Sequence, residues 1–352
     1  MPIKKYISGD NYKSLNKIFI RNETYSNEFR CPIVPKDIKN LISYGFIIYI
    51  ESSDNRCYKD EEYKENGAII VNNNWVGYTD FLILGIKELQ NIELINNNCH
   101  IYFSHSYKNQ INSNYILDLF KKSNSILFDL EYFVKNNKRI IAFGYYAGIV
   151  GCGLGLLQYF LKLEKKKLNN LKYWNAVYEL FSDVNKLINK NSYKPEICLI
   201  GPKGRCGLGV TFFLDLFCLK YTSLDSNDKK DNLEEYDIIF NCINLKDDIG
   251  IWFDDNTKFN KNLVISDISC DYNNPNNPIK IYNSKTTWSN PIYSYNEFVD
   301  IIAIDNLPSL LPFDSSIEFS SKMIKLFETF KDDEFNYWKN NYEIYQEKIN
   351  NI

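Results

Sequence analysis

The sequence predicts a protein of the α/β class, with two domains that are each built on a mostly parallel sheet. Three observations predict this. Short apolar segments alternate with helical segments along most of the chain, as they do around parallel sheets. A glycine-rich turn joins an apolar strand to a helix within residues 196–210. The 352 residues, of which 45% are hydrophobic, suffice for two packed domains at about 150 residues each.

The first part of the chain supplies the first set of alternating elements. We expect a helix at 36–44, because Pro35 suits the first turn of a helix and Gly45 suits its end. The other expected helical segments are 59–65 and 111–121, and the expected strands are 17–21, 46–51, 67–71, 81–86, 100–103 and 125–130.

Polar residues stand just beyond several of these strands. Lys87, His105 and Glu131 each follow an apolar strand, and Arg30 lies in the loop after the first one. The carboxyl ends of parallel strands line the ligand crevice of such sheets, so these four side chains are expected to lie together in one ligand-binding crevice. The alternative is that these residues have no part in a binding site. Lys87, Glu131 and Arg30 would then be solvated loop residues, and His105 would be a hydrogen-bonded loop histidine.

Residues 140–161 form an apolar segment that contains no Asp, Glu, Lys or Arg over 22 residues, which is long enough to span a bilayer. Its glycines at 144, 148, 151 and 155 repeat a spacing that is common in packed membrane helices. A buried helix that packs closely on other backbone is the alternative. We favour the buried helix, because a single membrane span between long polar flanks is unusual.

The glycine-rich turn predicts a nucleotide site. Gly201, Gly204 and Gly207 recur every third residue after the apolar strand 197–200. Glycines let backbone N–H groups approach a pyrophosphate and aim a helix N-terminus at it. The spacing differs by one residue from the usual dinucleotide fingerprint, and a plain strand-to-helix turn is the alternative. Asp225 lies 18 residues beyond Gly207 (225 − 207), where a carboxylate accepts ribose hydroxyls and repels a 2′-phosphate, which favours NAD over NADP.

The remaining elements belong to the second domain and to the C-terminal tail. The tail at 314–350 is expected to be helical and amphipathic, and to pack against the rest of the protein rather than to form a binding surface. The expected helices are 143–163 and 174–190, and the expected strands are 197–200, 221–224, 237–240, 263–266 and 301–304.

Composition excludes several classes of function. The formal net charge is −3 and the pI is about 5.7, so no basic surface points to nucleic acid. No His/Cys cluster has the spacing of metal ligands, so we expect no metal. The nine cysteines include no CxxC pair and the N-terminus lacks an apolar signal segment, so reduced thiols and a cytoplasmic protein are expected. The sequence leaves open whether Cys206 and Cys242 form a disulfide.

Several segments together resemble the saccharopine dehydrogenase (NAD+, L-lysine-forming) family of the alanine dehydrogenase/transhydrogenase-like superfamily. They run in order from about residue 21 to residue 311, and they are RNETYSNEFRCPIVP, GAIIV, LILGIKEL, HIYFSHSYKNQ, LFDLEYF, RIIAFGYYAG, IGPKGRCGLG, DIIFNCI, DISCDYNNPNNPI and IDNLPSLLP. The chain departs from the family after Asp225, at Asn244, and in about eleven extra residues before the first strand.

The resemblance implies two Rossmann-like domains that flank a cleft. Residues 1–142 and 315–352 would form the substrate domain, and residues 143–314 would form the NAD-binding domain, with the C-terminal helices packing back on the first domain. Segment 143–163 would then connect the domains, which removes the membrane alternative.

The resemblance also implies roles for single residues. Lys87 would be the catalytic base and His105 the acid–base residue, while Glu88 and Glu131 would tune their basicity. The implied substrate contacts are Arg30, Lys87, Gln110, Arg139 and Phe143. The implied NAD contacts are Arg30, Gly204, Arg205, Asp225, Ile268, Ile304, Asp305, Asn306 and Leu307.

The activity implied is the reversible, NAD-dependent oxidation of saccharopine to lysine and 2-oxoglutarate, the last step of the α-aminoadipate route of lysine synthesis. The expected partners are these small molecules alone, with no nucleic acid and no membrane, and the chain is expected to be a monomer. An alanine or opine-type dehydrogenase is the alternative enzyme. A catalytically silent nucleotide-sensing or scaffold protein is the alternative from another class, which the presence of both Lys87 and His105 disfavours.

Overall fold

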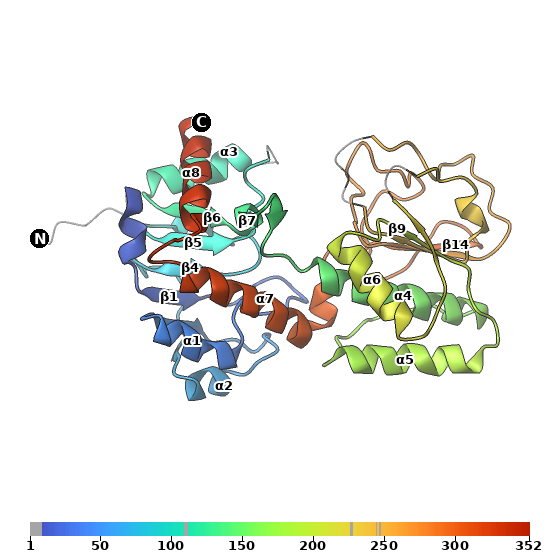
Figure 1. Cartoon of the computed structure of the whole chain (residues 1–352), viewed down its shortest axis with the longest axis horizontal. Coiled ribbons are helices and arrows are strands. Elements are labelled where there is room, and N and C mark those ends of the chain that lie inside the picture. The colour runs from blue at the N-terminus through green and yellow to red at the C-terminus, as the bar shows by residue number, and fades with distance from the viewer. Residues whose placement is uncertain (1–8, 109–111, 226–227, 244, 246–247) are drawn as a thin grey trace, which may run out of the picture. The chain divides into compact units, whose positions relative to one another are not determined.

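The computed structural model describes residues 9–108, 112–225, 228–243, 245 and 248–352, and the chain forms two compact units. Unit 1 combines Met1–Ala142 with Ser315–Ile352, and unit 2 is Phe143–Asp314. Unit 1 is therefore discontinuous in the sequence, since the whole of unit 2 is inserted between its two segments. Figure 1 shows both units as helices packed around a twisted sheet, which confirms the α/β class expected from the sequence.

Unit 1 contains a six-stranded parallel sheet in the order β3-β2-β1-β4-β5-β6. The strands are β1 (Lys17–Ile20), β2 (Ile47–Glu51), β3 (Ile69–Val71), β4 (Leu82–Leu84), β5 (Cys99–Tyr102) and β6 (Ile126–Asp129). The strand order reverses between β1 and β4. Ligands of open α/β sheets bind at the carboxyl side of such a reversal, so the loops after β1 and β4 are the place to look for a site.

Helices and short turns surround this sheet. They are η1 (Gly9–Ser14), η2 (Pro35–Asp37), α1 (Ile38–Ser43), α2 (Asp60–Glu65), η3 (Ile92–Leu94), α3 (Ser113–Lys122), η4 (Leu130–Tyr132), α7 (Pro312–Glu328) and α8 (Tyr337–Asn350). A two-stranded hairpin, β7 (Val134–Lys135) and β8 (Lys138–Arg139), stands outside the sheet.

The C-terminal segment completes the core of unit 1. The red helices α7 and α8 lie beside the strands of this unit in Figure 1. Trp338 is fully buried, and its ring meets those of Phe128 and Phe133 at centroid distances of 5.2 and 4.8 Å. Asn341 Nδ2 donates to the carbonyl of Asp129 at 2.8 Å. The tail therefore packs back on the first domain, as expected.

Unit 2 contains a second six-stranded sheet, in the order β10-β9-β11-β12-β14-β13. Its strands are β9 (Ile197–Ile200), β10 (Thr222–Leu224), β11 (Ile238–Asn241), β12 (Leu263–Asp267), β13 (Tyr293–Ser294) and β14 (Val299–Ile302). All neighbours are parallel except β13, which runs antiparallel to β14. The strand order reverses between β9 and β11, so the loops after these two strands mark the ligand end of this sheet.

The helical elements of unit 2 are α4 (Gly144–Leu163), α5 (Val177–Lys190), α6 (Arg205–Asp215), η5 (Leu233–Glu235) and η6 (Leu307–Leu310). By length and composition α4 passes for a membrane span, and 72% of its apolar window is buried inside the protein. It packs on α5, α6, β11 and β12. A Cβ atom added at Gly148 would overlap the carbonyl oxygen of Cys206 in α6. Gly148 thus allows close packing of α4 against α6.

Candidate active site

Lys87 lies in the loop that follows β4, next to the point where the strand order of unit 1 reverses. Its side chain is half-buried, and Nζ lies 5.9 Å from the centroid of the Tyr25 ring. Its backbone is bonded to side chains of the loop after β1: Lys87 N donates to Glu23 Oε2 at 3.0 Å, and Lys87 O accepts from Arg21 Nη2. Two loops far apart in the sequence therefore build this part of the site.

His105 lies beyond β5 and stands between two carboxylates. Its Nε2 is 3.8 Å from Glu88 Oε1, and its Nδ1 is 3.9 Å from Glu131 Oε1. The backbone of His105 is left-handed, with φ of 53°, a conformation that is uncommon outside glycine and worth a functional explanation. Three residues expected from strand ends, His105, Glu88 and Glu131, are thus brought together.

Glu131 is the anchor of this group. Its side chain is 8% exposed and pairs with Lys108 Nζ at 2.5 Å and with Arg139 Nη1 at 2.9 Å. Burial acts to raise the pKa of Glu131, but the Lys108 hydrogen bond and the charges of Arg139, Lys108 and His105 outweigh it, so the pKa lies below its ordinary value. Glu131 therefore stays ionised at neutral pH and offers His105 a fixed negative charge.

One residue beneath this group, Asp129, was not predicted from the sequence. Asp129 is fully buried at the end of β6, where Oδ2 accepts from Ser104 Oγ at 2.6 Å and Oδ1 accepts from Glu131 N at 2.9 Å. Burial raises the pKa of Asp129. The available signal was a single acid inside an otherwise apolar strand, which calls for buried hydrogen-bond donors.

Tyr25 is a second residue that the sequence did not indicate. Its hydroxyl donates to Glu88 Oε2 at 3.0 Å, while its ring lies beneath the Lys87 ammonium. Burial and the charge of Glu88 raise the pKa of Tyr25 to about 12, so it stays a neutral donor. Tyr25 thereby links Lys87 to the carboxylate that faces His105.

The other residues expected at the substrate are distributed as follows. Arg30 is 5% exposed and forms a two-pronged ion pair with Glu28, at 2.7 and 2.5 Å. It lines a small cavity together with Arg21 and Glu23. Phe143 stands at the N-cap of α4 in unit 2, and Gln110 lies outside the described residues. Contact of these residues with substrate stays a prediction.

The glycine-rich turn of unit 2 has the geometry of an anion site. Gly201 has φ of 83°, and a Cβ atom at Gly207 would overlap the Gly201 carbonyl, so both positions require glycine. Gly204 is the N-cap of α6 and makes no side-chain cap hydrogen bond, and Arg205 begins the helix. A helix N-terminus at this position is the kind of element that binds an anion through its backbone amides. Cys206 and Cys242 are both free thiols, so the disulfide left open by the sequence is not formed.

The other expected cofactor contacts lie at the carboxyl end of the same sheet. Asp225 follows β10 and pairs with Lys203 at 2.5 Å. Ile268 follows β12 and donates its N–H to Asn241 O at 3.0 Å. Ile304, Asp305 and Asn306 lie in the connection from β14 to η6, and Leu307 begins η6.

Asp267, the last residue of β12, was not predicted as part of the cofactor end. It is 1% exposed, accepts from the Tyr282 hydroxyl, and accepts from Asn241 Nδ2 at 2.9 Å. Burial raises the pKa of Asp267 to about 6 despite these donors. The network ties β11 to the loop that carries Ile268.

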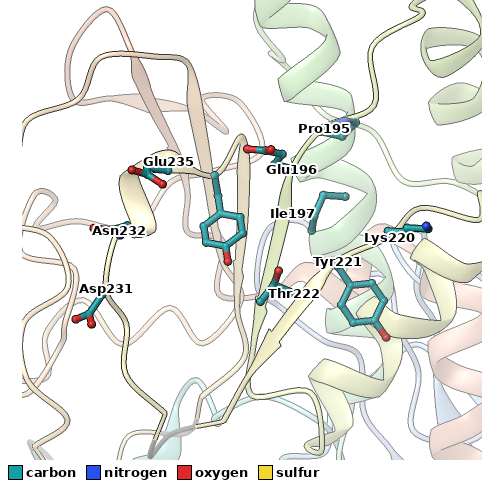
Figure 2. A pocket seen from close by; sticks show the side chains of 10 residues that line it. Pro195, Glu196, Ile197, Lys220, Tyr221, Thr222, Asp231, Asn232 and Glu235 are labelled. Atoms are coloured by element: carbon teal, nitrogen blue, oxygen red, sulfur yellow. The ribbon is translucent and has the colours of Figure 1, made fainter.

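Figure 2 shows a different cavity, of about 590 Å³, in unit 2. Its walls include Glu196, Ile197, Lys220 and Thr222. These residues stand at or before the first residues of β9 and β10, which is the end of the sheet opposite the glycine turn. None of the expected site residues lines it, so it is not the candidate active site. In the part of the chain that the structure describes, no three His, Cys, Asp or Glu side chains are grouped to hold a metal ion.

The sequence is similar to those of known dehydrogenases. Residues 19–150 match the family "Alanine dehydrogenase/PNT, N-terminal domain". A saccharopine dehydrogenase [NAD(+), L-lysine-forming] of Candida glabrata is 33% identical over 340 residues, covering 88% of this chain and 91% of that protein. One of Schizosaccharomyces pombe is also 33% identical, covering 90% and 93%.

Two solved structures share the fold. An L-alanine dehydrogenase superposes with a TM-score of 0.67 at 12% identity, covering 94% of this chain and 93% of that one. A transhydrogenase from Sinorhizobium meliloti gives a TM-score of 0.61 at 13% identity, covering 88% and 92%. At these identities the likeness concerns the fold alone.

Proposed function

The chain belongs to the saccharopine dehydrogenase (NAD+, L-lysine-forming) family, and from this premise we infer that it is an oxidoreductase that converts L-saccharopine to L-lysine and 2-oxoglutarate. The observation that carries this inference is the near full-length similarity to six such dehydrogenases at 28–33% identity. The alanine dehydrogenase alternative has less support, because that likeness is one of fold.

The turn between β9 and α6 suits a nicotinamide dinucleotide. Gly201 and Gly207 permit a tight turn of the backbone, and the N-terminus of α6 that follows it, at Gly204 and Arg205, presents backbone amides of the kind that bind a pyrophosphate. Gly204 and Arg205 would contact the phosphates, and Asp225 would accept the adenosine ribose hydroxyls. The residues from β12 and β14 named above would line the remainder. Bound NAD supplies the acceptor for the hydride that leaves the substrate α-carbon.

The residues of unit 1 supply the acid–base chemistry. Saccharopine is a lysine joined through its ε-nitrogen to the α-carbon of a glutamate unit, and that nitrogen needs a free lone pair before the imine forms. Lys87 is the proposed acceptor of its proton. After water adds to the imine carbon, His105 is the proposed residue that moves protons so that the carbinolamine splits into lysine and 2-oxoglutarate. Glu88 and Glu131 hold His105 between two negative charges.

The substrate carries three carboxylates, which calls for cationic partners. Arg139 and Arg30 are the proposed partners, and each is paired with a glutamate in the described structure. When substrate binds, each arginine would pair with a substrate carboxylate, either in place of its glutamate or in addition to it. We also propose that the protein works as a monomer in the cytoplasm, where its nine free thiols would stay reduced.

A single assay tests the proposed reaction. Purified protein is given NADH with lysine and 2-oxoglutarate, and separately NADH with ammonia and pyruvate, and the loss of NADH absorbance is followed. We expect oxidation with the first pair only. Oxidation with ammonia and pyruvate alone would identify an alanine dehydrogenase instead, and no oxidation with either pair would contradict both.

The preference for NAD over NADP is tested at Asp225. Asp225→Ala removes the carboxylate that would repel a 2′-phosphate, so the rate with NADPH relative to NADH is expected to rise. Asp231→Ala is the control, since Asp231 is an exposed acid of the same segment that pairs with Lys229. An unchanged ratio in Asp225→Ala would contradict the assignment.

A further inference from the structure

Arg21 and Glu23 form a buried ion pair just beyond β1. Their side chains are only 3% and 4% exposed, and Arg21 Nη1 lies 3.3 Å from Glu23 Oε2. Neither residue has a part in the proton transfers described above. Burying two charges is costly unless each gains further hydrogen bonds, so their other contacts indicate what the pair is for.

Those contacts converge on one peptide segment. The Glu23 carboxylate accepts from Ile86 N at 2.6 Å and from Lys87 N at 3.0 Å. Arg21 Nη2 donates to the Lys87 carbonyl. The pair therefore bonds both backbone groups of Lys87, one from each partner.

The same segment is bonded to β5 on its other side. Gly85 N donates to Ile101 O at 3.0 Å, and Ile86 O accepts from Phe103 N at 3.1 Å. Arg21 itself is fixed, because its own N–H donates to Leu84 O at 3.0 Å and its guanidinium lies 5.9 Å from the centroid of the Tyr102 ring. The backbone leading to Lys87 is thus held from both neighbouring strands.

Gly85 makes the room that this arrangement needs. A Cβ atom at position 85 would overlap the guanidinium of Arg21. The φ of Gly85 is not positive, so an alanine there meets no backbone strain of that kind and acts through the guanidinium alone. One added methyl group therefore displaces Arg21 without removing any polar group.

We propose that Arg21 and Glu23 are positioning residues that fix the Lys87 backbone, and through it the amine that accepts the substrate proton. The inference rests on the proposed function for its kinetic consequence, but the clamp itself is a property of unit 1. A proton acceptor loses effect steeply when it is misplaced, since a shift of about 1 Å can cost as much as 10²-fold in rate.

Three variants test the clamp by kinetics. Gly85→Ala displaces Arg21, Arg21→Lys keeps the charge but loses the fork, and Glu23→Gln keeps the shape but loses the charge. For each we expect kcat to fall about tenfold or more, while KM for NAD changes less than about twofold, because the cofactor residues lie in unit 2. The matched control is Lys162→Met, which breaks the buried Lys162–Asp300 pair of unit 2 and is expected to leave kcat largely unchanged.

A double variant separates displacement of Arg21 from general damage. Once Arg21→Ala has removed the guanidinium, the methyl group of Gly85→Ala no longer overlaps any part of residue 21. The double variant is therefore expected to be no slower than Arg21→Ala alone, whereas independent effects would multiply. Multiplying losses in kcat would overturn the proposal.

A second readout does not depend on turnover. Lysines are labelled with trinitrobenzenesulfonate at a series of pH values, and the extent of labelling at Lys87 is measured by mass spectrometry of its peptide. In the clamp variants we expect the pH dependence at Lys87 to shift, while labelling of Lys138 on β8 stays as in the wild type. Unchanged labelling of Lys87 in all three variants would overturn the clamp even if the wild type proved inactive with saccharopine, and a shifted profile in an inactive protein would reject only the proposed reaction.

Discussion

At the residue scale, the proposed acid–base pair depends on neighbours that carry charge. Lys87 is bonded through its backbone to Arg21 and Glu23, and His105 stands between Glu88 and Glu131. A lysine that acts as a base must present an uncharged amine within hydrogen-bonding distance of the proton that it accepts. The surroundings of these two side chains thus set the reaction as much as the side chains do.

Replacing Lys87 tests its role directly. Lys87→Met keeps the length of the side chain but has no basic group, so kcat for saccharopine oxidation is expected to fall by about 10²-fold or more. Lys138→Met, at an exposed position of β8, is expected to keep wild-type kcat. Wild-type turnover in Lys87→Met would exclude Lys87 as the base.

Asp267 gives a prediction on pH. Its pKa is raised from 3.8 to about 6 by burial, so the folded protein holds this proton more tightly than the unfolded chain. The resulting contribution to the free energy of unfolding is complete below about pH 4 and is lost as the pH rises through about 6. It amounts to at most about 3 kcal/mol.

Asp267→Asn cannot ionise and lacks this loss. Urea midpoints measured from pH 4 to pH 8 should therefore rise for Asp267→Asn relative to wild type as the pH increases. Asp215→Asn, an exposed position at the end of α6, should run parallel to wild type. A constant difference between Asp267→Asn and wild type would show that Asp267 does not titrate in this range.

The sequence predicted those site residues that a simple topological rule can reach. Lys87, Glu88, His105 and Glu131 follow strands directly, and parallel strands bring their carboxyl ends to one edge. Tyr25 and Asp129 could not be found this way. The partner of Tyr25 is 63 residues away, and Asp129 reads as part of its strand, so only the folded contacts disclose their parts.

At the scale of elements, the sequence predicted the alternation of strands and helices better than their limits. Strand β14 begins at Val299, two residues before the expected 301–304, and the antiparallel β13 was not predicted. The expected C-terminal helix is two helices, because Asp333 and Asn336 take positive φ between them. Such breaks depend on local hydrogen bonds, which hydrophobic periodicity does not report.

The contact between α4 and α6 gives a prediction at this scale. Gly148→Ala would drive a methyl group into the Cys206 carbonyl, so α6 must shift, and we expect unit 2 to lose about 1–3 kcal/mol of stability. Gly153→Ala is the matched control in the same helix. Its methyl group meets the side chain of Leu180, at 2.7 to 2.9 Å, and no backbone atom is among its nearest neighbours, so we expect a smaller loss than for Gly148→Ala.

Thermal unfolding and NADH binding measure the two glycine variants. Because α6 begins at the glycine turn, Gly148→Ala should weaken NADH binding as well as lower the melting temperature. If Gly153→Ala proved as damaging as Gly148→Ala, close backbone packing would not be the reason for glycine at 148.

At the scale of the whole molecule, unit 1 depends on a segment that is remote in the sequence. Trp338 fills the space between Phe128, Phe133, Phe327 and Phe330. The amphipathic pattern of the tail predicted that it would pack, but it did not specify which faces it would cover, since many apolar surfaces accept an aromatic helix equally well.

Trp338→Ala is expected to destabilise unit 1 by about 3–5 kcal/mol, the usual cost of emptying a large buried aromatic site. Phe335→Ala is the control, because Phe335 is half exposed, and its loss is expected to change stability by less than about 1 kcal/mol. Differential scanning calorimetry would measure both. Equal melting temperatures for Trp338→Ala and wild type would contradict the structural role of the tail.

The interrupted path of unit 1 also has a consequence for how the protein is made. Residues 143–314 form a compact unit of their own and are made before Trp338, which packs on the rings of Phe128 and Phe133. About 200 residues separate Phe133 from Trp338, so the apolar surface around Phe128 and Phe133 stays uncovered for roughly 10–40 seconds of translation. We therefore expect unit 1 to be prone to aggregation during synthesis until its C-terminal segment has been made.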